Sequence, residues 1–170
     1  TITNMYSFTI TAYIKNLNNL KAILEKAKAW QLSQKISDEA IMDARLALDQ
    51  FTFAKQVRSV TYFAKSTAAE LCGVEAPAFE DNEKNLTELQ TRIDVVVAYL
   101  STLTPEMVKT DLEARLVPLA WMKGKGMTAK YFIEEYAHAN FYFHYTTAYT
   151  ILRHYGLQIG KGDFITDVQF

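Results

Sequence analysis

The chain has 170 residues, of which 49% are hydrophobic and 22% charged, and its formal net charge at pH 7 is −1. These values predict a single soluble domain over residues 1–170 with one continuous core. The chain has no basic block and no apolar run of about 20 residues, so we expect neither a nucleic-acid nor a membrane partner. The single cysteine excludes an internal disulfide and is typical of a cytoplasmic protein.

Four segments carry apolar residues at alternating spacings of three and four, which predicts four amphipathic helices. Polar N-caps and glycine stops bound several of them: Asn85 and Thr128 as caps, Gly73 and Gly156 as stops. Four such helices are what a four-helix bundle requires. In chain order the predicted helices cover residues 6–27, 53–71, 86–103 and 133–154.

The connections predict smaller elements. A short extra helix begins at Ser37, with acidic residues in its first turn. Residues 74–84 form a loop, and Thr104-Pro105 starts one helical turn. Residues 115–127 form a small β-hairpin or an extended arm before the last helix. Long first and third connections would permit the first two bundle helices to run parallel over part of their length.

The fourth helix combines aromatic and polar residues. From Ala137 to Leu152 it has no Asp, Glu, Lys or Arg, yet it contains His138, Asn140 and His144. Asn140 and His144 are four residues apart and share one helical face at the bundle seam. Buried polar groups need partners. This pair could ligate a metal, orient a substrate, or form a hydrogen-bonded network within the core.

A zinc site made from histidines alone is excluded by geometry. All three histidines lie on one helix, with spacings of six and ten residues that prevent them from sharing an ion. We therefore expect no metal. His138 lies beside acidic residues and is predicted to be partly exposed, whereas His154 follows Arg153 in the last turn and complements the helix dipole. Cys72 ends the second helix, where the dipole disfavours a thiolate.

Two further polar or aromatic groups have alternative interpretations. Arg45 and Asp49 are four apart and could form a surface ion pair, or Arg45 could meet an anionic ligand at the bundle mouth. Tyr142, Tyr145 and Tyr149 lie at spacings of three and four, off the Asn140 and His144 seam. They could face a partner subunit or pack under the 113–127 arm.

Several segments together resemble a bacterial family of unknown function within the DinB/YfiT-like superfamily. The resemblance spans nearly the whole chain, and its most specific part is the run from Asn140 to His154. It implies an all-α, up-down-down-up four-helix bundle and frequent homodimers. The segments that carry it are Ala44-Arg45-Leu46, Asp49-Gln50-Phe51, Gln56-Val57, Pro77-Ala78-Phe79-Glu80-Asp81, Glu88-Leu89-Gln90-Thr91-Arg92-Ile93, Asn140 to Tyr149, Ile151 to His154 and Gly160 to Phe164.

The resemblance also implies a site between helices. Characterised relatives in the superfamily are metal-dependent, including transferases that act with low-molecular-weight thiols, and hold their metal by one His on helix two and two on helix four. The corresponding positions here are Ser59, Asn140 and His144, so one imidazole of the three remains. We therefore predict that the inter-helix pocket persists without a metal. A zinc or nickel ion is the less favoured alternative.

Three functional hypotheses follow, and the sequence leaves open whether the protein is an enzyme. The first is a small-molecule binding protein or metal-free enzyme that uses Asn140 and His144, with Ser59 opposite and Arg45 and Tyr149 near the mouth. In an enzyme, His144 would be the general base and Asn140 its orienting partner. The second is a non-catalytic homodimeric interaction module. The third is a metal-dependent thiol S-transferase.

Overall fold

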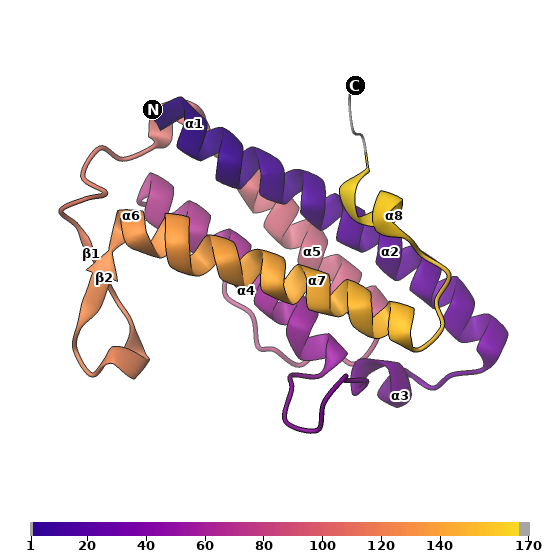
Figure 1. Cartoon of the computed structure of the whole chain (residues 1–170). Coiled ribbons are helices and arrows are strands. Elements are labelled where there is room, and N and C mark those ends of the chain that lie inside the picture. The colour runs from indigo at the N-terminus through magenta and orange to yellow at the C-terminus, as the bar shows by residue number, and fades with distance from the viewer. Residues whose placement is uncertain (1, 167–170) are drawn as a thin grey trace.

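The computed structural model describes residues 2–166, and four long helices form a bundle (Figure 1). They are α2 (Ala12–Gln34), α4 (Phe53–Cys72), α5 (Leu86–Ser101) and α7 (His138–His154). Helices α2 and α7 run in one direction and α4 and α5 in the other. Around the bundle, α2 packs on α5, α5 on α4, and α4 on α7, which is the most extensive contact. The predicted up-down-down-up bundle is confirmed.

The parallel pair of consecutive helices is α4 and α5, so the expectation that the first two bundle helices run partly parallel is wrong (Figure 1). The first connection turns back at one end of the bundle. It contains the short helix α3 (Asp38–Met42), capped by Ser37 as predicted, and a loop closed by a 2.7 Å hydrogen bond from Phe53 N to Ala44 O. The connection over residues 73–85 instead returns along the bundle, which makes α4 and α5 parallel.

The core follows the predicted stripes, because residues three and four apart share a helix face. Local capping agrees as well: Asn85 Oδ1 accepts a hydrogen bond from Glu88 N at 2.9 Å, and Thr128 Oγ1 accepts one from Tyr131 N at 3.2 Å. Gly73 ends α4 with φ of 64°, a left-handed conformation that favours glycine. Fully buried side chains of the four predicted stripes include Leu17, Leu20, Leu24, Val57, Val60, Ala64, Leu89, Ile93, Val96, Ala137 and Ile151. Phe141 and Ala148, which lie outside the fourth predicted stripe, are fully buried as well.

Smaller elements flank the bundle. Helix α1 (Ile2–Tyr6) and a π-helical segment (Ser7–Thr11) precede α2, and helix α6 (Ala129–Tyr131) and a second π-helical segment (Phe132–Ala137) precede α7. The 3₁₀ turns span Pro105–Met107 and Ala120–Met122, and helix α8 (Lys161–Ile165) follows α7. Strands β1 (Leu116–Pro118) and β2 (Gly126–Thr128) pair antiparallel and form the predicted hairpin arm, which projects from one end of the bundle (Figure 1).

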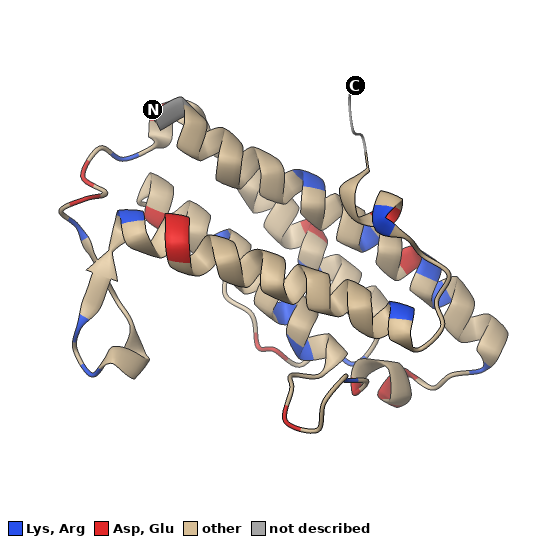
Figure 2. Ribbon diagram, viewed as in Figure 1, with Lys and Arg blue, Asp and Glu red and all other residues tan. Residues whose placement is uncertain are grey.

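Charged residues are interspersed over the outside of the helices (Figure 2). Within residues 2–166, no helix is both long and apolar enough to cross a membrane.

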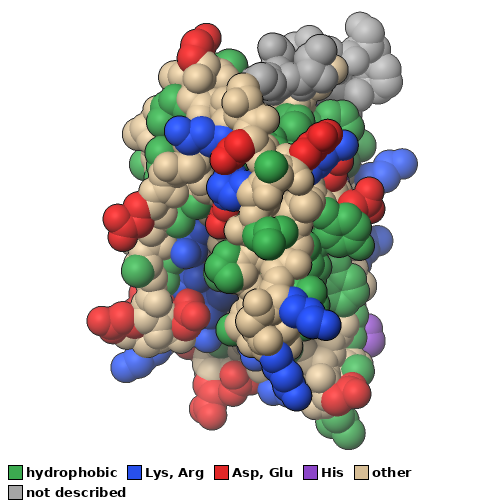
Figure 3. Space-filling view, turned by 90° about the vertical axis from the view of Figure 1, so that its left-hand side faces the viewer, with side chains coloured by type: hydrophobic (Ala, Val, Ile, Leu, Met, Phe, Trp, Pro, Cys, Tyr) green, Lys and Arg blue, Asp and Glu red, His purple; other side chains and the backbone are tan. Residues whose placement is uncertain are grey.

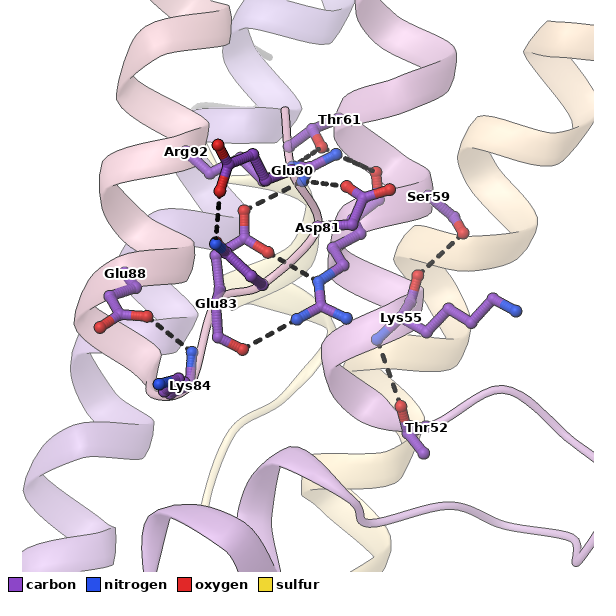
Figure 4. Close-up of polar contacts among 12 residues, drawn as sticks. Thr52, Lys55, Ser59, Thr61, Glu80, Asp81, Glu83, Lys84, Glu88 and Arg92 are labelled. Carbon is purple, nitrogen blue, oxygen red and sulfur yellow. Dashed lines mark hydrogen bonds and ion pairs between the residues drawn. The ribbon is translucent and has the colours of Figure 1, made fainter. Parts of the chain in front are cut away.

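A buried arginine ties the 73–85 connection to the bundle (Figure 4). Arg92 on α5 is 4% exposed, and its guanidinium donates to Asp81 at 2.5 Å and to Glu83 at 3.0 Å. It also donates to Thr61 on α4 at 2.7 Å, while Arg58 donates to Glu83 at 2.7 Å. Burial raises the pKa of Glu83, but the hydrogen bonds from both arginines outweigh burial, so the pKa lies below its usual value. One connection is thereby fixed to two helices.

Replacing Arg92 by Met should destabilise the fold strongly. Breaking a buried pair leaves a charge without its partner, which costs about 3 kcal/mol or more. Urea unfolding measures this loss. Lys21→Met is the control, because Lys21 and Asp94 form an exposed ion pair at 2.6 Å between α2 and α5, worth at most about 1 kcal/mol. Equal losses in the two variants would contradict a structural role for the Arg92 contacts.

Candidate functional site

Among the predicted site residues, His144 lines a cavity between α4, α7 and the 43–52 loop. It lies on α7, is 7% exposed, and has its Nδ1 atom 2.7 Å from Gln56 Oε1 on α4. Gln56 Nε2 donates to Phe51 O at 3.3 Å, which places the amide oxygen toward the imidazole. Nδ1 must therefore carry the hydrogen in the neutral ring, which leaves a lone pair on Nε2.

Aromatic rings enclose this imidazole. Phe51 and Phe63 lie nearly parallel to it on centroid distances of 6.0 and 5.7 Å, and Phe143 meets it edge-on at 5.2 Å. Burial lowers the pKa of His144 from 6.5 to about 4, because the apolar surroundings disfavour the charged form. At neutral pH His144 is an uncharged ring whose Nε2 is a hydrogen-bond acceptor.

The cavity beside His144 has a volume of about 240 Å³ and lies between the 43–52 loop, α4 and α7. Its lining includes Gln50, whose Oε1 atom is buried without a hydrogen-bond partner among the described residues. A buried acceptor without a partner costs free energy, so a group that donates to it would be stabilised there. The full lining is Asp49, Gln50, Phe51, Gln56, Phe143 and His144.

Asn140 does not line this cavity, although it lies one turn before His144 as predicted. It is half-buried, and its Nδ2 atom donates to Tyr136 O at 2.8 Å in the preceding turn. Ser59 does not face His144 either. Its hydroxyl donates to Lys55 O at 2.8 Å, and it lines a separate cavity beside Arg58. The α4 residue that meets His144 is Gln56, three positions earlier.

Arg45 and Tyr149 also lie away from the cavity lining. The Arg45 guanidinium donates to Leu48 O at 3.3 Å and to Gln50 O at 3.4 Å, so it binds two backbone carbonyls of the 43–52 loop. The expected ion pair with Asp49 is not formed among the described residues, because these carbonyls take the guanidinium instead. Tyr149 packs edge-on against Phe164 at 5.9 Å.

The predicted packing of the tyrosine stripe under the 113–127 arm is wrong, because the chain after α7 folds back over Tyr145 and Tyr149. Its burial also prevents Tyr145 from facing a partner subunit. Tyr145 is fully buried, stacks on Phe164 of α8 at 3.9 Å and donates to Phe164 O at 2.7 Å. Tyr142 accepts a hydrogen bond from Asn16 of α2 at 3.1 Å.

The other two histidines lie outside the cavity. His138 is half-buried, with Nδ1 3.1 Å from the Tyr13 hydroxyl, and burial lowers its pKa. His154 is exposed in the last turn of α7, as predicted.

Sequence reasoning missed Gln50, Phe51 and Phe143 as cavity residues. Phe143 adjoins His144, so its identity as a neighbour was available from the sequence. Gln50 and Phe51 lie in an irregular loop, where no periodicity indicates which side chains face inward.

The residues at the superfamily's metal positions do not fit a metal. Ser59 and Asn140 use their polar atoms on backbone carbonyls of their own helices, and His144 Nδ1 is bound to Gln56. Among the described residues, no group of three or more His, Cys, Asp or Glu side chains is placed to hold an ion. One imidazole with an amide and a hydroxyl does not supply the three His, Cys or carboxylate ligands that usually hold Zn²⁺ in proteins.

The lowered pKa of His144 predicts a pH dependence of stability. Between pH 6.5 and about 4 the unfolded chain binds a proton at this residue that the folded protein does not bind. Stability from this group is complete above pH 6.5 and decreases as pH falls toward 4, by roughly 2–3 kcal/mol. Urea unfolding at several pH values should show this decrease in the wild type and a smaller one in His144→Gln.

The matched control is His154→Gln, which replaces the exposed imidazole near the end of the same helix. It should keep the wild-type pH dependence. An identical pH profile for wild type and His144→Gln would contradict the assignment of a neutral, buried imidazole at residue 144.

Comparisons with known proteins agree with this architecture. A family model described as "Domain of unknown function (DUF1993)" matches residues 5–165. The crystal structure of a DinB family member protein from Shewanella denitrificans is similar to this chain, with 34% sequence identity and a TM-score of 0.91. The match covers 100% of this chain and 98% of that chain. The comparison with curated proteins gives no match. The chain therefore belongs to the DUF1993 family and has the DinB-like four-helix-bundle fold.

Proposed function

We propose that the protein binds a small molecule rich in hydrogen-bond donors in the cavity beside His144. The observation that carries this proposal is the His144 ring at the cavity, whose Nε2 lone pair makes no hydrogen bond within residues 2–166. The buried Oε1 of Gln50, also without a partner there, is a second acceptor that a rotation of the Gln50 side chain would bring to a ligand. The carboxylate of Asp49 adds a third acceptor to the lining, and Phe51 and Phe143 provide apolar walls. Sites that combine apolar walls with a few placed polar groups are typical of small-molecule binding.

Binding is favoured over acid–base catalysis by His144. A general base works best when its pKa is near the operating pH, and a pKa of about 4 makes this imidazole a weak proton acceptor. Asn140 does not orient the ring, since Gln56 does. Metal-dependent thiol transfer is not proposed, because the three donor positions do not converge.

Gln50→Leu should separate stability from binding. Removing a buried acceptor that has no partner should leave the free protein as stable or about 1 kcal/mol more stable. The affinity for ring compounds carrying N–H or O–H donors, selected from a fragment library by ligand-observed NMR, should fall about tenfold per lost hydrogen bond. His144→Phe, which keeps an aromatic ring but has no ring nitrogen, should bind the same fragments with lower affinity than the wild type.

The matched control for this experiment is Tyr99→Phe. The Tyr99 hydroxyl is also buried without a partner among the described residues, but it lies outside the cavity. This variant should keep wild-type fragment affinity. The proposal is wrong if no fragment binds beside His144, or if Gln50→Leu binds them as the wild type does.

A second candidate function, homodimerisation, is favoured by the hairpin arm. Leu116, Trp121 and Tyr131 are 64%, 63% and 55% exposed. Figure 3 shows hydrophobic side chains exposed among charged ones at the end of the molecule that carries this arm. Large exposed apolar side chains that lie close together mark interaction surfaces. A second copy of the chain is the simplest partner, since a symmetric dimer uses the same surface twice.

Sedimentation equilibrium tests the dimer. Trp121→Glu would place a charge in the interface, so the variant should be monomeric at concentrations where the wild type is dimeric. Leu48→Glu is the control, because Leu48 is 96% exposed on the loop near the other end of the bundle. A monomeric wild type, or a dimer that Trp121→Glu leaves intact, would contradict this candidate.

A further inference from the structure

A second cavity lies on α4 beside the 73–85 connection. Its volume is about 190 Å³, and it shares no lining residue with the His144 cavity. Figure 4 shows Lys55 and Ser59 one turn apart on α4, with Asp81 and Arg92 beside the same helix. The lining residues are Lys55, Arg58, Ser59, Tyr62, Asp81 and Arg92.

This cavity has an excess of positive charge. Three of its lining residues are cations and only Asp81 is a carboxylate. Glu83 accepts hydrogen bonds from Arg58 and Arg92, so those two cations are balanced by two carboxylates. Lys55 and the neighbouring Lys65 have no carboxylate within ion-pair distance among the described residues. The three lining cations against Asp81 and Glu83 leave one uncompensated charge, and Lys65, which lies beside the lining, adds a second.

The Lys65 environment agrees with this excess. Burial lowers the pKa of Lys65, the nearby Arg92 charge lowers it further, and the charge of Asp81 raises it in part. An anion close to these groups would offset both effects, because an opposite charge favours the protonated amine.

Hydrogen-bond donors remain available at the cavity. The Arg58 guanidinium uses Nε and Nη2 on Glu83, while its Nη1 makes no hydrogen bond within residues 2–166. The Lys55 ammonium lies 3.7 Å from the centre of the Phe51 ring and is otherwise unbonded in the described part of the chain. Arg92, which is 4% exposed, is held in place by its contacts with the connection and with Thr61. The free Nη1 donor of Arg58 therefore lies beside the fixed Arg92 guanidinium. The Lys55 ammonium points away from Arg92 over the Phe51 ring (Figure 4), on a flexible side chain that can turn toward the cavity.

We infer that this cavity binds the phosphate group of a small phosphate ester. Such a group carries a charge of about −1.5 to −2 at pH 7, which would offset the uncompensated charges of Lys55 and of the neighbouring Lys65. Its oxygens accept hydrogen bonds from guanidinium and ammonium groups in the geometry these side chains offer. The assignment is independent of the ligand proposed for the His144 cavity, since neither site contributes a residue to the other.

Isothermal titration with inorganic phosphate and with glycerol 3-phosphate, at an ionic strength held constant with sodium chloride, tests the site. Lys55→Gln should lower the affinity for both ligands at least fivefold, and Lys55→Arg should restore the wild-type affinity. Asp81→Asn, which removes the lining carboxylate, should raise the affinity for both ligands severalfold. Asn also tolerates the left-handed backbone at this position, where φ is 55°. Lys15→Gln removes an equal charge from an exposed site on α2 and should change neither affinity.

Side-chain ¹H–¹⁵N spectra locate the bound anion. Phosphate should shift the guanidinium resonances of Arg58 and Arg92, while those of Arg153 on α7 stay fixed. The inference is overturned if phosphate does not bind above the chloride background, or if Lys55→Gln and Lys15→Gln have equal affinities. Binding to phosphatidic acid vesicles without binding glycerol 3-phosphate would also overturn it, because the ligand would then be a membrane headgroup.

Discussion

The buried guanidinium of Arg92 is the constraint on which the topology depends. Two consecutive parallel helices need a connection that returns along the length of the bundle, and such a connection has little core of its own. Arg92 and Arg58 hold this one by ion pairs to Asp81 and Glu83. Phe79 adds a cation–π contact, with its ring centre 4.2 Å from the Arg92 guanidinium. These polar contacts therefore hold the 73–85 connection on the bundle, and they fix α4 against α5.

With α4 fixed in this way, its opposite face is presented to α7. Gln56 joins the two helices through His144, and Phe63 covers one side of the imidazole. The 43–52 loop completes the cavity because Arg45 binds two of its carbonyls, which brings Phe51 onto the other side of the ring. Helix α4 thus separates two chemically different spaces. One is aromatic and rich in acceptors, and the other is cationic and rich in donors.

Helix geometry explains why Gln56, and not Ser59 at the superfamily's metal position, meets His144. Gln56 and Ser59 are three residues apart on α4, about 60° apart around the helix axis. That rotation is enough to turn Ser59 toward the cationic cavity while Gln56 faces His144. Gln56 satisfies the imidazole nitrogen that faces α4, so the buried ring is held by a neutral hydrogen bond.

Local features were determined by the sequence alone. The four helices, the caps at Ser37, Asn85 and Thr128, and the hairpin arm all follow from periodicity and short-range hydrogen bonding, which act within a few residues. The inward position of His144 follows from the same periodicity. Only the tertiary structure decided which groups meet. Phe164 covers Tyr145 because the chain turns back after α7, and Gln50 lines the same cavity as His144 because the 43–52 loop folds over α4. Contacts of this kind join residues far apart in sequence, and no local pattern encodes them.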